Sequence, residues 1–418
     1  MTETSAAGTP SAASPARGAA AAFIFVTILL DMLALGLIMP ILPKLVESFV
    51  DNDTAHAARI FGLFGTAWAL MQFFFSPILG SLSDRFGRRP VVLLSNFGLG
   101  LDYVLMALAP SLIWLFVGRV ISGITSASIS TAFAYIADIT PPERRAAVFG
   151  KIGAAFGAGF VIGPAIGGLL GHADPRLPFW VAAGLSFANT IYGLLILPES
   201  LARDRRAPFR WRSANPIGAL GLLRSDRMLA GLSLSNFFGQ LAHAVLPSTF
   251  VLYATYRYGW DSRTVGATLA MVGICAMLVQ GAGIGPIVRL FGERLALLLG
   301  LACGAAGFLI FAVAPTGPLS WLGIPVMSLW GVSGAAIQSL MTKRVAADQQ
   351  GQLQGANTSV QSVSQLLGPS LFTLTFAYFI GQQAPTQLPG APFFLASALV
   401  LLALGIALRT LLGREALS

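Results

Sequence analysis

The long apolar runs of this chain restrict its fold more than any other feature of the sequence. A helix needs about 20 mostly apolar residues to cross a bilayer. Only 10% of the residues are charged, against roughly 25% in a soluble domain. We therefore predict an all-α membrane protein with twelve transmembrane helices. The runs cover residues 21–43, 60–80, 91–109, 112–137, 146–170, 178–197, 228–252, 264–288, 294–314, 319–342, 353–380 and 391–411.

The basic residues between these runs predict how the chain is oriented. An even number of spans places both termini on one side of the membrane. If that side is the cytoplasm, the cytoplasmic segments hold 20 Lys and Arg residues and the outer segments hold 5. Such an excess is the usual pattern in membrane proteins, so we expect cytoplasmic termini. The same loops explain the formal charge of +9. They form no basic face of the kind that binds nucleic acid, and no nucleic-acid partner is expected.

A long hydrophilic connection, "PESLARDRRAPFRWRSANP" from Pro198, divides the chain between the sixth and seventh runs. A weak internal repeat agrees with this division, because "GSLSDRFGRRP" (80–90) follows the second run and "GPIVRLFGERL" (285–295) follows the eighth. Duplicated halves are typical of secondary transporters. We predict a disordered cytoplasmic N-terminus (1–20), a six-helix bundle (21–197), a basic cytoplasmic linker (198–227), a second six-helix bundle (228–411) and a cytoplasmic tail (412–418).

Three ionisable residues fall inside the predicted spans of the first half. Asp31 and Asp102 are the only acids within spans, and Arg119 is the only basic residue once Lys151, Arg294 and Arg409, at the cytoplasmic ends of their runs, are counted with the loops. A charge at the centre of a membrane helix costs roughly 2.5–3.5 kcal/mol on insertion scales and by default marks function. A carboxyl group there can exchange a proton as a cavity opens to one side and then the other. The alternative is a structural ion pair, in which case one arginine would serve two acids.

The predicted spans of the second half contain no acid but several neutral or weakly basic polar residues. At helical spacing, Gln361 and Gln365 share a face, as do Asn236, Gln240 and His243. Such faces could line a substrate cavity, and hydrogen bonds between helices would explain each residue equally well. The candidate cavity residues are Gln72, Asn236, Gln240, His243, Gln338, Asn357, Gln361 and Gln365.

The fifth run is rich in glycine. Gly159, Gly163 and Gly167 are four residues apart and lie on one helix face, where small residues let two backbones approach closely. Pro164 prevents an ideal helix at the same place. Ordinary membrane packing is the alternative explanation.

These motifs together resemble the major facilitator superfamily, in its twelve-span drug:H⁺ antiporter family. The loop "GSLSDRFGRRP" is similar to the superfamily signature between spans two and three. Arg119 followed by Gly123 matches the span-four signature, and "GFVIGPAIGG" matches the antiporter signature of span five. Stretches such as "LDMLALGLIMPILPKL" and "AYIADITPPERR" resemble the tetracycline efflux proteins of Gram-negative bacteria. The resemblance covers nearly the whole chain after residue 20.

The resemblance implies the major facilitator fold, with two pseudo-symmetric six-helix bundles that work by alternating access. It implies a monomer in the bacterial inner membrane that exports a drug-like molecule, tetracycline-like or multidrug, in exchange for H⁺. Cofactors and enzyme activity are not expected, and Mg²⁺ would enter only as part of a chelated substrate. The implied site residues are Asp31, Asp102 and Arg119 for proton coupling; Gly80, Asp84, Arg85, Gly87, Arg88, Arg89, Asp138 and Arg144 for a cytoplasmic gating loop; and Gly159, Gly163, Pro164, Gly167 and Gly168 for the antiporter motif.

The sequence departs from the tetracycline exporters at two positions. Those proteins have an essential acid in span nine and usually a histidine in span eight. Gly304 and Ala276 stand at or near these places here. The substrate therefore stays open. The alternatives are an exporter of a specialised metabolite and a facilitator that imports a nutrient or siderophore-like compound, although the span-five signature argues against import.

Overall fold

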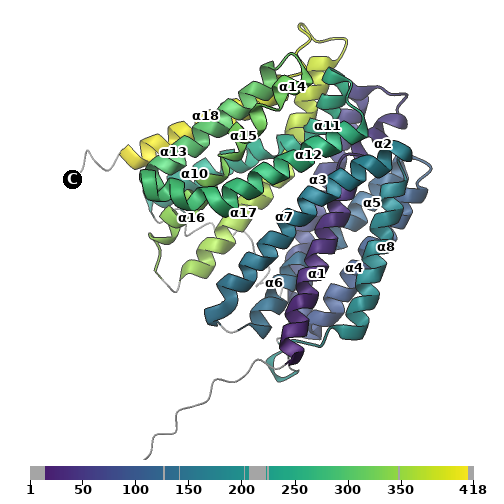
Figure 1. The fold of residues 1–418 in the computed structure, drawn as a ribbon, viewed down its shortest axis with the longest axis vertical. Helices are drawn as coiled ribbons and strands as arrows, with labels where there is room; N and C mark the ends of the chain where they lie inside the picture. Colours follow the sequence, from purple (N-terminus) through teal and green to yellow (C-terminus); the bar gives the residue numbers. More distant parts are fainter. Residues whose placement is uncertain are drawn as a thin grey trace, which may run out of the picture.

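The computed structural model describes residues 15–125, 128–140, 142–201, 203–206, 223, 226–346 and 349–412. All regular structure in these residues is helical (Figure 1), so the predicted all-α fold is confirmed. Ten helical stretches are long and apolar enough to cross a membrane, and Leu112–Thr125 is a shorter apolar helix. One of the ten, Ser262–Val313, covers two of the predicted runs. The number of twelve spans stays a prediction.

The first half begins earlier than the sequence indicated. The first helix starts at Pro15, inside the segment expected to be a disordered tail, because "PARGAAAA" is rich in alanine, the best helix former. The helices of this half are α1 (Pro15–Ile38), α2 (Leu42–Ser48), α3 (Thr54–Phe86), α4 (Arg88–Leu108), α5 (Leu112–Thr125), α6 (Ser128–Ile139), α7 (Pro142–Ala173) and α8 (Leu177–Ile196).

The second half follows a short 3₁₀ turn, η1 (Arg203–Arg205). Asp226 and Asp261 cap its first and third helices by accepting hydrogen bonds from the backbone N–H groups of Met228 and Thr264. Its helices are α10 (Arg227–His243), α11 (Val245–Tyr258), α12 (Ser262–Leu278), the π-helical turn η3 (Val279–Gly283), α13 (Ile284–Val313), α14 (Gly317–Ser320), α15 (Gly323–Ser328), α16 (Gly331–Thr342), α17 (Gln350–Ile380) and α18 (Ala391–Leu412).

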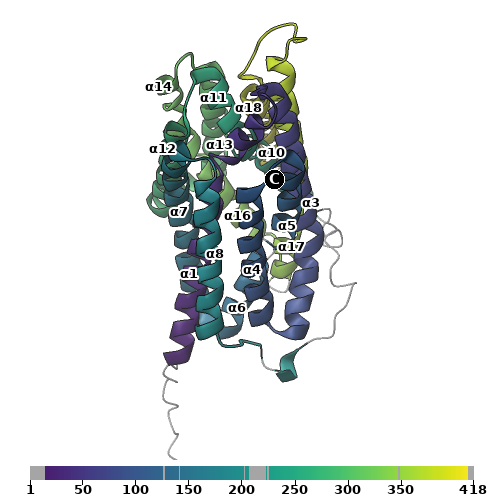
Figure 2. The ribbon, with the colours of Figure 1, turned by 90° about the vertical axis from the view of Figure 1, so that its right-hand side faces the viewer.

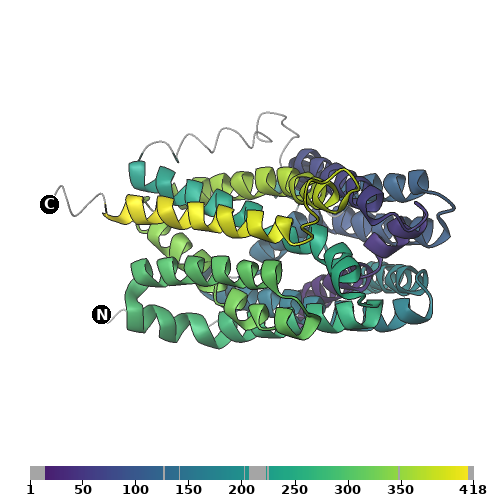
Figure 3. The same ribbon diagram turned by 90° about the horizontal axis from the view of Figure 1, so that it is seen from above.

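The two halves lie side by side as separate helix bundles. Figure 2 shows the first-half helices running nearly parallel to one another. In Figure 3 the green and yellow helices extend to one side and the purple and blue helices to the other. Large apolar side chains such as Leu94, Ile113 and Leu195 are 69%, 74% and 80% exposed. Lipid tails rather than water can solvate these residues, as expected for transmembrane helices.

The internal repeat of the sequence has a structural counterpart. Gly87 joins α3 to α4 with φ 109°, and Gly292 interrupts α13 with φ 73°. Both values lie in the region that favours glycine. Each glycine follows a phenylalanine, Phe86 or Phe291, in the repeated loops. The two loops therefore share a glycine with positive φ as well as a sequence pattern.

The halves contact each other most extensively through two helix pairs, α7 with α12 and α3 with α17, and α11 also contacts α2 and α3. A Cβ placed on Gly65 of α3 would lie 2.8 Å from Cβ of Pro369. The hydroxyl of Thr66 lies 2.7 Å from that of Ser370 on α17. These contacts involve the first half of α3 and the second half of α17. Figure 1 shows the two bundles converging at the α2–α14 end and spreading apart toward the α6–α16 end.

Candidate functional site

The predicted gating loop carries a network of charge-assisted bonds around Arg88. Its guanidinium Nη1 lies 2.6 Å from a carboxylate oxygen of Asp84. Its Nε lies 3.2 Å from Oδ2 of Asp138, at the end of α6. It also donates to the hydroxyl of Ser83 at 2.6 Å. Because bonds between ionised groups are about twice as strong as neutral ones, this cation ties the α3–α4 loop to α6.

The central connection joins the same network, which the sequence did not indicate. Glu199 accepts a hydrogen bond from the backbone N–H of Arg88 at 2.9 Å, and Ser200 donates to Asp138 at 3.2 Å. A Cβ on Gly87 would overlap the Glu199 carboxylate. Gly87 therefore leaves space for this carboxylate, and its positive φ permits the turn.

The other predicted loop residues make separate contacts. Arg89 donates to the carbonyl of Leu194 at 2.8 Å, and the Arg85 guanidinium lies 5.1 Å from the centre of the Phe86 ring. The described partner of Asp84 is Arg88. The side chain of Arg144 lies outside the described residues. A Cβ on Gly80 would meet nothing within 4 Å.

The second half repeats this arrangement with the charges exchanged. Glu293, which follows Gly292, lies 2.7 Å from Nζ of Lys343, just after α16. It also accepts from the hydroxyl of Ser339 at 2.6 Å. In the first half a cation of the loop pairs with an acid at the end of α6; here an acid of the loop pairs with a cation after α16. The second-half loop therefore keeps an ion pair to a neighbouring helix end, although its motif has no counterpart of Asp84.

Asp102 and Arg119 form a buried pair between α4 and α5. Their closest oxygen and nitrogen atoms are 3.8 Å apart, and Asp102 is 0% exposed. The Arg119 guanidinium also lies 3.4 Å from the sulfur of Met106. A Cβ on Gly118 would come within 2.8 Å of a carboxylate oxygen of Asp102, so the glycine leaves room for the acid.

Asp31 lies on α1 near Asn189 of α8, a residue that the sequence reasoning missed. The side chain of Asn189 accepts a hydrogen bond from Thr27 at 3.0 Å. Tyr103, also missed, lies within electrostatic range of Asp31, Asp102 and Arg119. Among the described residues no ion pair involves Asp31. Arg119 therefore serves one acid, and the two carboxyl groups have different surroundings in the same bundle.

The residues of the predicted antiporter motif contact two neighbouring helices, α1 and α12. Gly163 packs on α1, where a Cβ would lie 2.7 Å from Cα of Gly36, and Gly159 and Gly167 face the same helix. Gly168 instead faces the other half, where a Cβ would lie 2.5 Å from the carbonyl oxygen of Ser262 and 3.0 Å from Cα of Gly266. Pro164 also serves both sides: its ring lies against Gly36, and its carbonyl lies against Gly266. The motif therefore joins α7 to α1 within one bundle and to α12 across the halves.

Three of the predicted cavity residues lie together in a pocket of about 250 Å³ in the second half, which we call the second-half pocket. Asn236, Gln240 and His243 come from α10, and Gln280 comes from η3. Trp330, just before α16, adds an aromatic wall. Neither Gln280 nor Trp330 was among the predicted cavity residues, and single aromatic residues in apolar runs give no signal of a cavity. The remaining lining includes Val272, Ala276, Leu301, Met327 and Ile337.

The other predicted cavity residues do not line this pocket. Gln338 and Asn357 bond to each other at 3.1 Å, which fits the alternative of a hydrogen bond between helices. Gln361 and Gln365 are exposed on α17, and Gln72 is partly exposed on α3. Their transport roles stay predictions.

The end of the molecule opposite the Arg88 network holds further links between the halves. Because α3 is a helix of 33 residues, its two ends are about 50 Å apart at 1.5 Å per residue. Lys44 donates from α2 to the carbonyl of Trp260 at 3.0 Å. His172 Nδ1 lies 3.3 Å from Oδ2 of Asp261. Hydrogen bonds from Thr264, with smaller effects of His172 and Lys44, lower the pKa of Asp261 below its ordinary value of 3.8.

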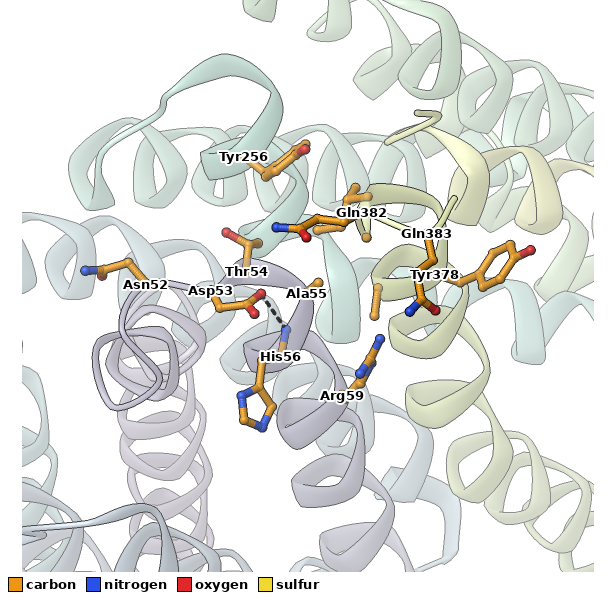
Figure 4. A pocket seen from close by; sticks show the side chains of 13 residues that line it. Asn52, Asp53, Thr54, Ala55, His56, Arg59, Tyr256, Tyr378, Gln382 and Gln383 are labelled. Atoms are coloured by element: carbon orange, nitrogen blue, oxygen red, sulfur yellow. Dashed lines mark hydrogen bonds between the residues drawn. The ribbon is translucent and has the colours of Figure 1, made fainter. Parts of the chain in front are cut away.

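A cavity of about 550 Å³ lies at this same end. Figure 4 shows Arg59 and His56 on α3, together with Gln382, Gln383 and the ring of Tyr378 from the end of α17 and the loop after it. The walls thus come from both halves. Like the α7–α12 contacts, they show that the bundles meet at the α2–α14 end.

Two similar halves built of long apolar helices, with charged side chains buried among the helices of the first half, define a multi-pass membrane transport protein. The sequence profile of the Major Facilitator Superfamily matches residues 24–369. The chain therefore belongs to the Major Facilitator Superfamily, which confirms the resemblance drawn from its motifs.

Its relatives include proteins of bacterial drug resistance. The chain is 39% identical over 354 residues to the tetracycline resistance protein, class C, of Escherichia coli, covering 84% of this chain and 88% of that protein. It is 35% identical over 351 residues to the class B protein of Escherichia coli, covering 83% and 86%.

Solved structures share the fold. The human organic anion transporter MFSD10 (TETRAN) matches 94% of this chain and 100% of its own, with 25% identity and a TM-score of 0.69. A bacterial homolog of the human lysosomal transporter Spinster, in an inward-facing and unoccupied conformation, matches 96% and 99% with 16% identity and a TM-score of 0.76. At that identity the likeness shows the fold alone.

Proposed function

We propose that this chain is a monomeric antiporter of the bacterial inner membrane that exports a drug-like small molecule from the cytoplasm in exchange for protons. The observation that carries the proposal is the buried Asp102–Arg119 pair, with Asp31 nearby in the same bundle and without a basic partner among the described residues. Two carboxyl groups in different surroundings can change protonation separately. The names of the tetracycline resistance relatives support export of a drug.

The arrangement of the two halves supports a direction of access. The bundles converge at the end that carries Lys44 and His172 and spread apart toward the Arg88 end. The distribution of Lys and Arg residues favours the Arg88 end as the cytoplasmic one. In this state the molecule would accept substrate from the cytoplasm.

Alternating access then requires the α7–α12 and α3–α17 contacts to separate. Substrate would bind in the second-half pocket, and the bundles would rock until that pocket faces outward. Protonation of Asp31 or Asp102 from outside would favour release of the substrate. Loss of the proton to the cytoplasm would restore the binding state. Arg88, Asp84 and Asp138 would bias the equilibrium between the two states.

Everted membrane vesicles, acidified inside, test this function. A drug panel that includes tetracycline with Mg²⁺ is added, and a fluorescent dye reports the pH gradient. The Asp31→Asn variant should bind drug but release no protons. Drug-dependent proton release in wild-type vesicles that is absent in this variant is the expected result. Proton release that is undiminished in Asp31→Asn would contradict the assigned coupling residue, and no response to any drug from folded protein would favour the metabolite exporter or the importer.

A further inference from the structure

We propose that the second-half pocket recognises an uncharged aromatic group of the exported molecule, stacked on Trp330 and hydrogen-bonded by side-chain amides, without a metal ion. This inference rests on the proposed function, because it names the class of substrate that the exporter would carry. The observations behind this inference are the packing of Trp330 and the chemistry of the residues around it.

The indole of Trp330 lies directly against the backbone of Gly304. A Cβ on this glycine would lie 2.8 Å from Cγ and 3.0 Å from Cδ2 of the indole. Any side chain at position 304 would therefore push the ring away from α13. The tryptophan and the glycine form one unit, and the ring takes the space that an acidic side chain at position 304 would need.

Neighbouring rings hold the indole in place. The Phe308 ring meets it edge-on, with centroids 5.5 Å apart at 74°, and the His243 ring lies 5.7 Å away at 50°. An aromatic wall that is already fixed loses little conformational freedom when a ligand ring stacks on it. Aromatic pairs prefer such offset or edge-on geometries, so a planar ligand has a suitable partner.

The polar groups of the pocket include three neutral side-chain amides, besides His243 and serine hydroxyls. Among the described residues, no hydrogen bond engages the side chains of Asn236, Gln240 or Gln280. Each amide offers both donors and an acceptor. The nearby hydroxyls of Ser235 and Ser333 instead donate to the backbone carbonyls of Ala403 and Trp330. The amides are thus the groups that would fix the orientation of a ligand.

The described lining of the pocket holds no carboxylate, lysine or arginine, and His243 is its one titratable side chain. Divalent cations such as Mg²⁺ prefer carboxylate oxygens, and a charge without a partner is costly to bury. The volume of about 250 Å³ is slightly below the usual range for drug sites, about 300–1,000 Å³. It therefore suits one ring system of a larger molecule.

Equilibrium binding to purified protein in detergent tests this inference without any proton gradient. The probes are two radiolabelled neutral aromatic molecules, chloramphenicol and acridone, and tetracycline, each with Mg²⁺ or with EDTA. At least one neutral probe should bind equally well under both conditions. Trp330→Ala should weaken its binding about tenfold, in line with base–aromatic stacking, and Trp330→Phe should retain most of it. Trp180→Ala is the control, because Trp180 is 44% exposed on α8 in the other half.

A second pair of variants tests the unit formed by position 304 and the indole. Gly304→Ala should weaken binding of the neutral probe as Trp330→Ala does, because the new Cβ displaces the indole ring. Gly405→Ala should not, since a Cβ there meets nothing within 4 Å. Thermal unfolding confirms that each variant is folded.

The possible results separate the two proposals. Binding that requires Mg²⁺, binding unchanged in Trp330→Ala, or failure of folded wild-type protein to bind either neutral probe would overturn the substrate class. Drug-driven proton release in vesicles would still stand in that case. Conversely, metal-independent binding that depends on Trp330, without any drug-driven proton release, would leave the pocket assignment intact and refute the antiport function.

Discussion

Gly168 of α7 and Gly266 of α12 bring the two halves of the molecule into backbone contact, because a Cβ on Gly168 would lie 3.0 Å from Cα of Gly266. The antiporter motif is thus part of the surface that must open and close during transport. Close approach of small residues is a common way for membrane helices to associate. The pair therefore sets how tightly the two halves can close at the α2–α14 end.

Replacing Gly168 by alanine should disfavour the state in which the outer end is closed. The new Cβ would lie 2.5 Å from the carbonyl of Ser262, and overpacking of this kind costs about 1–3 kcal/mol. We expect slower transport and greater outer access. In a background without Cys275 and Cys303, a cysteine at Ser262 should react faster with a membrane-impermeant thiol reagent. Gly153→Ala on the same helix is the control, since its Cβ meets nothing within 4 Å. Equal labelling rates in the two variants would contradict the prediction.

Removing the Arg88 guanidinium should loosen the loop between α3 and α4. Arg88→Ala leaves Asp84 and Asp138 without their cation, so we expect a loss on the order of 1–2 kcal/mol in stability. Arg88→Lys should recover only part of it, because an ammonium group cannot form the same forked contacts. Thermal unfolding in detergent measures both variants. Arg85→Ala serves as the control, because its described contact is the Phe86 ring; a comparable loss there would refute a special role for Arg88.

Exchanging the charges of Glu293 and Lys343 should test the second-half counterpart of this network. Glu293→Lys alone and Lys343→Glu alone place like charges together and should each lower stability. The double exchange restores an ion pair. Since Lys343 is 64% exposed, the coupling energy should be about 0.5–1 kcal/mol. A double-mutant cycle on unfolding midpoints gives this number, and strictly additive effects would show that the pair contributes nothing.

The pKa of Asp261, lowered by hydrogen bonds from Thr264, predicts a dependence of stability on pH. Because the folded-state pKa lies below its ordinary value, the ionised carboxylate stabilises the fold above that value. This contribution is lost as the pH falls through the folded-state pKa. Asp261→Asn keeps a capping oxygen but has no charge to lose. The difference in unfolding midpoint between wild type and Asp261→Asn should therefore shrink from about pH 5.5 to pH 3. A constant difference over this interval would contradict the assignment.

The sequence alone was sufficient for the membrane-spanning character, the helical fold and the superfamily. Lipid solvates only long apolar helices, so the runs predict the elements directly. The charges of Asp31, Asp102 and Arg119 were identifiable for the same reason, because each is costly within a span. Position 304 was also visible as a departure from the tetracycline exporters.

Tertiary structure decided which of these residues meet. Arg119 contacts Asp102 while Asp31 lies beside Asn189, a distinction that depends on how α1, α4, α5 and α8 pack. Glu199 reaches the Arg88 network across 111 residues of sequence. Trp330 covers Gly304 because α13 and α16 are neighbours. Apolar periodicity does not predict such pairings, because lipid-facing and helix-facing sides are both apolar and the neighbour is selected by close packing and hydrogen bonds between helices.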